Sequence, residues 1–194
     1  PGGKGSSPTG GGLVGFFGKL FGSKAAAAPP AAGLEPALTP DEQLAVERVR
    51  AWTQRNRDWN FRVYRTAAGL RLLATHAPFD PKDRETQTAM EALGADPLYV
   101  RLCRTQECFR ARLTPKPWRV GMRPPDMRFP YADRTQQEAM TAWLSRYDRS
   151  RSQVATCRLL MTLGSGETTN AVAGIVRLHD EEARVAQGPV LRLA

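Results

Sequence analysis

The sequence of 194 residues is long enough for one folded domain and a tail, and its 41% of hydrophobic residues can form a core, which excludes a wholly disordered protein. No apolar run approaches the roughly 18–20 residues that cross a bilayer, so we expect neither a membrane span nor a signal peptide. The net charge of +9 comes from 23 Arg and 5 Lys. This excess has two explanations: a GC-rich genome that enriches arginine, or an anionic partner such as nucleic acid, a phosphate group or an acidic protein.

The three cysteines, Cys103, Cys108 and Cys157, are an odd number and cannot all form internal disulfides. Such a set indicates a reducing compartment, and we therefore expect a cytoplasmic protein. Four residues separate Cys103 from Cys108, a spacing that matches no common zinc or redox motif. We predict neither a metal site nor a cofactor.

Residues 1–38 are predicted to form a disordered tail, because glycine, alanine, proline and serine bury too little apolar surface to offset the entropy of ordering. An island at residues 14–24 holds four large apolar residues at helical spacing beside lysines: Phe16, Phe17, Leu20 and Phe21. One interpretation is an interfacial helix that contacts a membrane or a protein partner. Three glycines would weaken that helix by roughly 1 kcal/mol each, so we do not expect membrane contact.

The same island is similar to the first residues of many bacterial proteins, which begin with Met-Gly-Phe-Phe. We therefore hypothesise that Val14, encoded by GTG, is the natural first residue and that residues 1–13 are translated upstream sequence. The intact mass of protein expressed from its own gene tests this hypothesis. A mass that includes residues 1–13 would contradict it.

Five segments have the apolar periodicity and end signals of helices. The first begins at Thr39, the N-cap, with Pro40 at the first helical position and Glu42 closing a capping box, and it ends near Asn56. The second and third begin at the Asp-Pro pairs 80–81 and 96–97, the fourth covers 134–147 with Met140, Trp143 and Leu144 facing inward, and the fifth covers 169–182.

A β-hairpin is the clearest strand signal. Residues 59–66 alternate between apolar and polar side chains, residues 67–69 can turn with Gly69 at positive φ, and residues 70–76 return. A further strand is predicted over 108–113, while residues 154–163 are either a strand or the start of a buried helix. The order of elements predicts an α+β fold, with a small antiparallel sheet, a β-hairpin and helices packed on one face, in a single domain over residues 39–194.

Basic residues gather on one face of this predicted sheet. Arg110 and Arg112 are two apart and share a strand face, and Arg62 and Tyr64 do the same on the hairpin, with Arg71 across the turn. Guanidinium groups beside an aromatic ring suit phosphates and unstacked bases. The alternative is a solvated face whose arginines pair with acids from elsewhere. The predicted nucleic-acid-binding residues are Arg62, Tyr64, Arg71, Arg110, Arg112, Lys116 and Arg119.

Enzymatic chemistry has weaker support, and we predict no catalytic residue. His76 and His179 each have an acid nearby, as a general base or metal ligand would need, but His179 lies on an apolar helical face that is typical of a hydrogen-bonded core residue. The turn at 164–169 resembles a phosphate loop before a helix but lacks the lysine and spacing of a P-loop. A glycine turn with a threonine N-cap is the alternative interpretation.

Three segments, residues 61–76, 93–103 and 109–119, are similar to a family of bacterial proteins of unknown function, and this similarity implies no activity. The Tyr-Arg-Thr-x-x-Gly hairpin, followed by an Arg-x-x-x-Lys segment, also resembles primase–polymerase-like domains. That resemblance implies an acidic metal-binding pair on a strand, and the sequence shows no such pair.

The leading functional hypothesis is a non-catalytic cytoplasmic domain that binds nucleic acid or another polyanion through the predicted basic surface. The first alternative is a protein-interaction or scaffold domain whose arginines only solvate the surface, which predicts a neutralised face and an exposed apolar patch. The second is an enzyme that uses His76 or the 164–169 turn, which predicts a pocket that gathers a histidine and a carboxylate.

Overall fold

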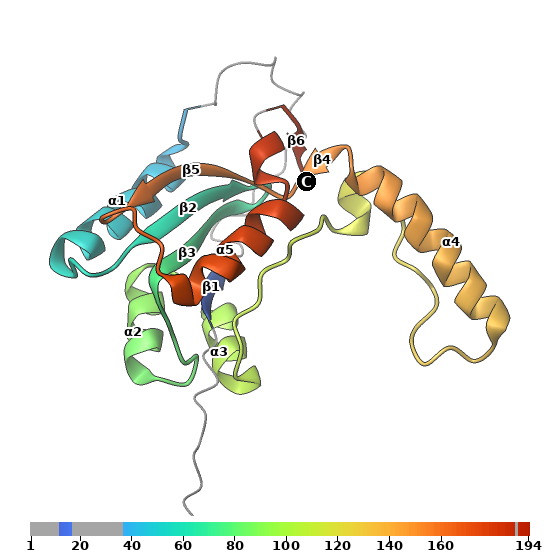
Figure 1. Cartoon of the computed structure of the whole chain (residues 1–194), viewed down its shortest axis with the longest axis horizontal. Coiled ribbons are helices and arrows are strands. Elements are labelled where there is room, and N and C mark those ends of the chain that lie inside the picture. Colours follow the sequence, from blue (N-terminus) through green and yellow to red (C-terminus); the bar gives the residue numbers. More distant parts are fainter. Residues whose placement is uncertain (1–11, 17–36, 189) are drawn as a thin grey trace, which may run out of the picture.

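The computed structural model describes residues 12–16, 37–188 and 190–194, and for residues 12–16 it describes the backbone alone (Figure 1). Its main sheet has four antiparallel strands in the order β1-β3-β2-β5. The bounds of these strands are Gly12–Phe16 for β1, Phe61–Thr66 for β2, Gly69–Pro78 for β3 and Cys157–Leu163 for β5. A second, parallel pair joins β4 (Val154–Ala155) to β6 (Arg192–Leu193) near the C-terminus.

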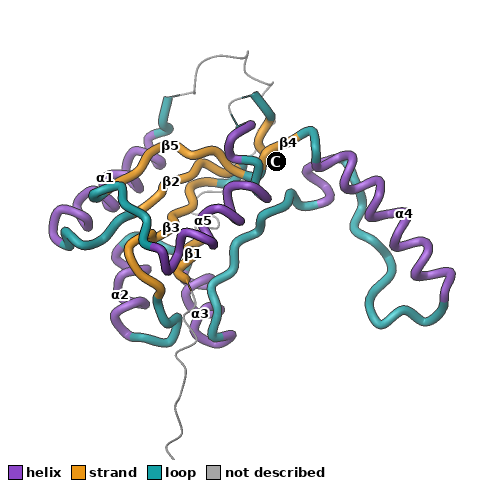
Figure 2. The backbone as a smooth tube through the Cα atoms, viewed as in Figure 1, coloured by secondary structure: helices purple, strands orange, loops and turns teal. Residues whose placement is uncertain are grey.

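Five α-helices and two short 3-10 helices complete the described chain (Figure 2). The α-helices are α1 (Pro40–Arg55), α2 (Arg84–Ala92), α3 (Pro97–Gln106), α4 (Arg134–Arg151) and α5 (Asn170–Glu182), and the 3-10 helices are η1 (Pro117–Val120) and η2 (Val185–Gln187). The predicted α+β class, the antiparallel sheet and the hairpin of β2 and β3 are confirmed. Gly69 has the positive φ expected of it, at 135°.

The two faces of the sheet bury different helices. Phe61, Val63 and Leu72 point to one face and join the main core with α1, α2 and α3, as predicted. Tyr64 and Leu73 point to the other face, where α5 covers them (Figure 1). The sheet is therefore covered on both faces, with one helix on the side for which the sequence predicted none.

The start of α1 is fixed by the predicted capping box, and the same residue that closes the box also binds the sheet. The Thr39 hydroxyl accepts from the Glu42 N–H at 3.2 Å, and Glu42 accepts from the Thr39 N–H at 2.9 Å. Glu42 also receives two hydrogen bonds from the largely buried Arg65 of β2, at 2.8 and 2.9 Å. One carboxylate therefore both caps α1 and ties it to the hairpin.

We expect Glu42→Gln to lower the free energy of unfolding by about 2 kcal/mol, because it removes the negative charge that faces the largely buried Arg65 guanidinium. Thr39→Ala removes only the cap and should cost about 1 kcal/mol. Urea denaturation of both variants measures the difference. Equal losses in the two variants would show that the ion pair adds nothing beyond the cap.

Two predicted elements differ in the structure. Residues 107–116 begin with a turn at Glu107, form no regular secondary structure and pair with no strand of the described chain, so the strand predicted over 108–113 is wrong. Helix α4 does not join the core, and its only buried residue is Tyr147, whereas Leu144, which was predicted to face inward, is 45% exposed. Residues 154–163, left open between strand and helix, form β4 and β5.

The N-terminal segment contributes a strand. Residues 12–16 of the predicted tail pair with β3 as β1, an interaction of backbone groups that requires no apolar side chain. Phe16 ends this strand, while Phe17, Leu20 and Phe21 lie outside the described residues. No helix in the described ranges is long and apolar enough to span a bilayer.

Candidate functional site

The sequence-predicted surface divides into two groups in the structure. Tyr64 and Arg71 are 0% and 1% exposed, and Arg62 is partly buried beside them, because α5 covers this face of the sheet. These three residues therefore do not form an open binding surface. Arg110, Arg112, Lys116 and Arg119 lie together on one continuous segment that leads from α3 towards α4 (Figure 1).

The buried group forms a hydrogen-bonded network centred on Asp180 of α5. One carboxylate oxygen of Asp180 accepts from Arg62 at 2.5 Å, and the other accepts from the Tyr64 hydroxyl and from Nδ1 of His179, both at 2.8 Å. Burial alone would raise the pKa of Asp180, but the hydrogen bonds from His179 and Tyr64 and the charge of Arg62 outweigh it and lower that pKa. Asp180 is thus held as the carboxylate that the neighbouring donors require.

His179 and Cys157 superficially resemble the base and nucleophile of a thiol enzyme, since Cys157 Sγ lies 3.9 Å from His179 Nε2. However, Nε2 accepts a hydrogen bond from the Arg71 guanidinium at 2.9 Å, because Nδ1 donates to Asp180. Burial lowers the pKa of His179 and raises that of Cys157 to about 11. The histidine has no acceptor left for the thiol proton, so this network fastens α5 to the sheet rather than activating a nucleophile.

The raised pKa of Cys157 predicts that this thiol reacts slowly with thiol reagents. Cys103 and Cys157 are buried and Cys108 is partly exposed, and all three are free thiols. At pH 8 we expect one thiol per folded chain to react rapidly with Ellman's reagent, and three to react in denaturant, because burial raises the pKa of Cys103 and Cys157 and shields both thiols, whereas Cys108 is accessible. Cys108→Ser should remove the rapid phase, and rapid labelling that persists in this variant would contradict the assignment.

His76 is also held in a structural position. Its Nδ1 accepts from the Asn60 N–H at 3.2 Å, and its ring packs against Trp59 and Phe79 at centroid distances of 4.6 and 5.1 Å. Burial lowers the pKa of His76, so the ring is neutral at physiological pH. The turn at 164–169 has positive φ at Gly164 and Gly166, and Thr169 is the N-cap of α5, as the glycine-turn interpretation predicted.

The exposed group begins on residues 107–116, which we call the connector. Side chains from other elements donate hydrogen bonds to its carbonyl groups. Tyr99 donates to the carbonyl of Arg110, Arg71 to that of Arg112, and Thr156 to that of Leu113. These three carbonyl groups thereby have hydrogen-bond donors without a sheet partner, while the side chains of Arg110 and Arg112 stay exposed. The two exposed guanidinium groups therefore extend from a stretch of backbone that hydrogen bonds hold in place.

The connector leads into a projecting element, residues 117–151, which we call the arm. It consists of η1, a loop and α4, and extends away from the sheet (Figure 2). Its base is anchored where the Tyr147 hydroxyl donates to the Pro115 carbonyl and where Arg192 donates to the Arg119 carbonyl at 3.1 Å. The indole N–H of Trp143 in α4 donates to the carbonyl of Arg123 in the loop at 3.0 Å, and this bond ties the loop to α4.

Positive charge is concentrated on the connector and arm. Residues 116–151 carry eight Lys or Arg against four Asp or Glu. Within the described chain, Arg134 pairs with Glu138, and Arg151 with Asp148 and Glu182, whereas the other arginines of this region form no ion pair. The arginines without a carboxylate partner are Arg110, Arg112, Arg119, Arg123, Arg128, Arg146 and Arg149. Arg123, Arg128, Arg146 and Arg149 were not among the predicted site residues, although the charge imbalance of this stretch could have indicated them.

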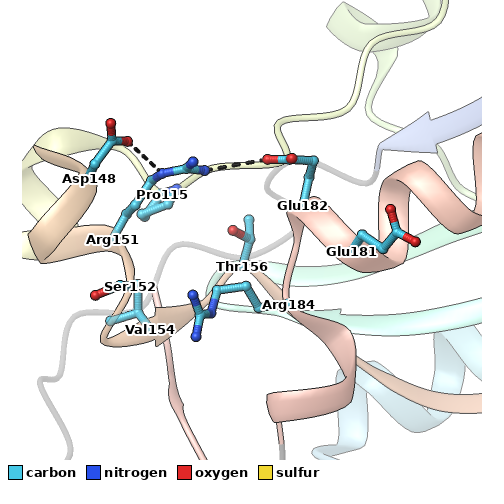
Figure 3. Close-up of a pocket in the computed structure, with 9 residues that line it drawn as sticks. All are labelled: Pro115, Asp148, Arg151, Ser152, Val154, Thr156, Glu181, Glu182 and Arg184. Carbon is cyan, nitrogen blue, oxygen red and sulfur yellow. Dashed lines mark hydrogen bonds and ion pairs between the residues drawn. The ribbon is translucent and has the colours of Figure 1, made fainter. Parts of the chain in front are cut away.

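A cleft of about 250 Å³ lies where the arm meets the body, between the ends of α4 and α5 (Figure 3). Arg151 bridges Asp148 of α4 and Glu182 of α5, at 2.8 and 3.5 Å. The lining residues are Pro115, Asp148, Arg151, Ser152, Val154, Thr156, Glu181, Glu182 and Arg184, without a histidine or cysteine. The cleft is thus a polar joint between arm and body, and it does not gather the groups that the enzyme hypothesis requires.

No family model, curated protein or solved structure matches the chain. The similarity to a bacterial family and to primase–polymerase-like domains therefore stays a prediction. In the described ranges, no group of three or more His, Cys, Asp or Glu is placed to hold a metal ion.

Proposed function

We propose that this chain is a non-catalytic cytoplasmic domain that binds nucleic acid through its connector and arm. The observation that carries the proposal is the set of exposed arginines in this region that have no carboxylate partner in the described chain. Three arginines of the sequence-predicted set belong to it, namely Arg110, Arg112 and the partly exposed Arg119, and the partly exposed Lys116 lies on the same segment. The proposed binding surface does not include Arg62, Tyr64 and Arg71, because these residues belong to the buried network beneath α5.

Two kinds of arginine in this chain support a ligand-binding role for the exposed ones. Arg62 and Arg65 lie on opposite faces of the sheet, and each is paired with a carboxylate from a covering helix. Exposed arginines without an ion pair also lie elsewhere in the described chain, as Arg50 and Arg57 do, so the proposal rests on the concentration of such residues in the connector and arm. Clustered guanidinium groups without counter-ions are suited to the repeated phosphates of a nucleic-acid backbone, whose release of counter-ions drives binding.

Fluorescence anisotropy of labelled oligonucleotides with the full chain tests the proposal, at about 50 and 200 mM salt. We expect binding that weakens steeply with salt and is reduced about tenfold in the Arg110→Ala/Arg112→Ala variant, which loses two phosphate contacts. The matched control is Arg50→Ala/Arg57→Ala, which removes the same charge from exposed positions at the end of α1. Absence of binding at low salt, or equal loss in the control, would contradict the proposal.

The alternative of a protein-interaction domain also has an observation in its favour. The arm exposes Leu144 as well as aromatic side chains, and it contributes a single buried residue, Tyr147, from α4. Exposed apolar side chains on a projecting element are typical of protein interfaces. Failure of every oligonucleotide to bind would favour this alternative.

A further inference from the structure

Two aromatic rings on the arm are unusually open to solvent. Trp118 of η1 is 61% exposed and Phe129 of the loop is 84% exposed. Large aromatic side chains normally pack against other side chains, and Trp143 and Tyr147 of α4 in the same arm do so as a stacked pair, with ring centroids 5.1 Å apart. Trp118 and Phe129 instead leave large apolar surfaces in water.

Each exposed ring lies beside positive charge. The ammonium group of Lys116 lies 4.9 Å from the centre of the Trp118 ring, and Arg119 follows Trp118 in the chain. Phe129 follows the exposed Arg128, and Tyr131 contacts its ring edge-on at 5.8 Å. Aromatic rings interleaved with cations form the arrangement that binds single-stranded nucleic acid, in which bases stack on rings while cations contact the phosphates.

We infer that the ligand of the arm is a single-stranded nucleic acid whose bases stack on Trp118 and Phe129; this inference rests on the proposed function. A duplex offers phosphates to the arginines, but it hides the faces of its bases within its own stack, so the two rings would contribute nothing to binding it. A protein interface fits less well at Trp118, because Lys116 lies against this ring and lysine is depleted at protein interfaces.

Single- and double-stranded oligonucleotides of equal length, titrated into the full chain, test this inference. We expect Trp118→Ala and Phe129→Ala each to weaken single-strand binding about tenfold and to leave duplex binding within about twofold. Trp118→Phe keeps a ring and should retain most of the affinity. The control is Leu144→Ala, which removes an exposed apolar side chain of the same arm that cannot stack on a base.

Each outcome separates the inference from the proposed function. If Arg110→Ala/Arg112→Ala weakens binding while Trp118→Ala and Phe129→Ala do not, the nucleic-acid proposal stands and the stacking inference is overturned. Equal losses for single strands and duplexes in the ring variants would also overturn the inference. If no oligonucleotide binds the unaltered chain, the proposed function itself fails.

Discussion

Replacement of Gly164 by alanine is expected to lower the free energy of unfolding by about 3 kcal/mol, the larger part of it from steric overlap. Gly164 has φ +89°, and a Cβ atom there would overlap the side-chain oxygen of Asn60 and the carbonyl oxygen of Trp59. Neither oxygen can move freely, because the Asn60 side chain accepts from the Ser165 N–H at 2.7 Å and Trp59 lies in the core.

Gly166 provides a matched control in the same turn. Its φ is +80°, close to that of Gly164, but the nearest atom to an added Cβ is 3.8 Å away, on Thr162. Gly166→Ala should therefore pay only the backbone cost of about 1 kcal/mol. Urea denaturation of the two variants gives the steric part by difference. If both variants lose the same stability, the contact between the turn and Asn60 is not what fixes Gly164.

The Asp180→Ala substitution should cost about 4 kcal/mol, because Arg62, Tyr64 and His179 all lose the same acceptor. The hydroxyl of Tyr64 is fully buried and would have no solvent to replace the carboxylate. Glu181→Ala, at an exposed neighbouring position of α5, should change stability by no more than about 0.5 kcal/mol. Comparable losses in the two variants would show that the network does not hold α5 on the sheet.

The pH dependence of the free energy of unfolding of the Asp180→Ala and Glu181→Ala variants tests the charge state of Asp180. Because the folded-state pKa of Asp180 is lowered, its contribution is present above the usual carboxylate pKa of about 4 and is lost as the pH falls further. His179 has a lowered pKa as well, so both proteins should lose stability as the pH falls below about 6.5, where the unfolded chain binds the proton. The difference between them should shrink only below about pH 4, and a constant difference down to pH 2.5 would contradict a charged Asp180.

The parts of the fold that sequence reasoning predicted have local causes. The start of α1 depends on Thr39 and Glu42, which are three residues apart, and the hairpin depends on alternation within β2 and on Gly69. Such signals are complete within a few residues, so they are readable without knowledge of the rest of the chain.

The errors arose where a distant segment decides the outcome. Alternation correctly placed Arg62 and Tyr64 on one face of β2, but it could not show that α5, more than a hundred residues later, covers that face. Residues 108–113 alternate as a strand does, yet Tyr99, Arg71 and Thr156 bind the carbonyls that a neighbouring strand would otherwise occupy. Of the seven residues of the predicted basic surface, four therefore lie on the connector and arm, and three lie in the buried network.

The sparse attachment of the arm has a consequence for how this protein can change over time. Helix α4 gives the fold only one buried residue, Tyr147, and its other side chains are at least partly exposed, including Arg151, which pairs with Glu182 of α5. Under the proposed function, substitutions on the arm change ligand binding at little cost to the free energy of unfolding, whereas substitutions beneath α5 destabilise the fold and are eliminated for that reason. The ligand preference of the proposed site on the arm can thus evolve almost independently of the sheet and its packed helices.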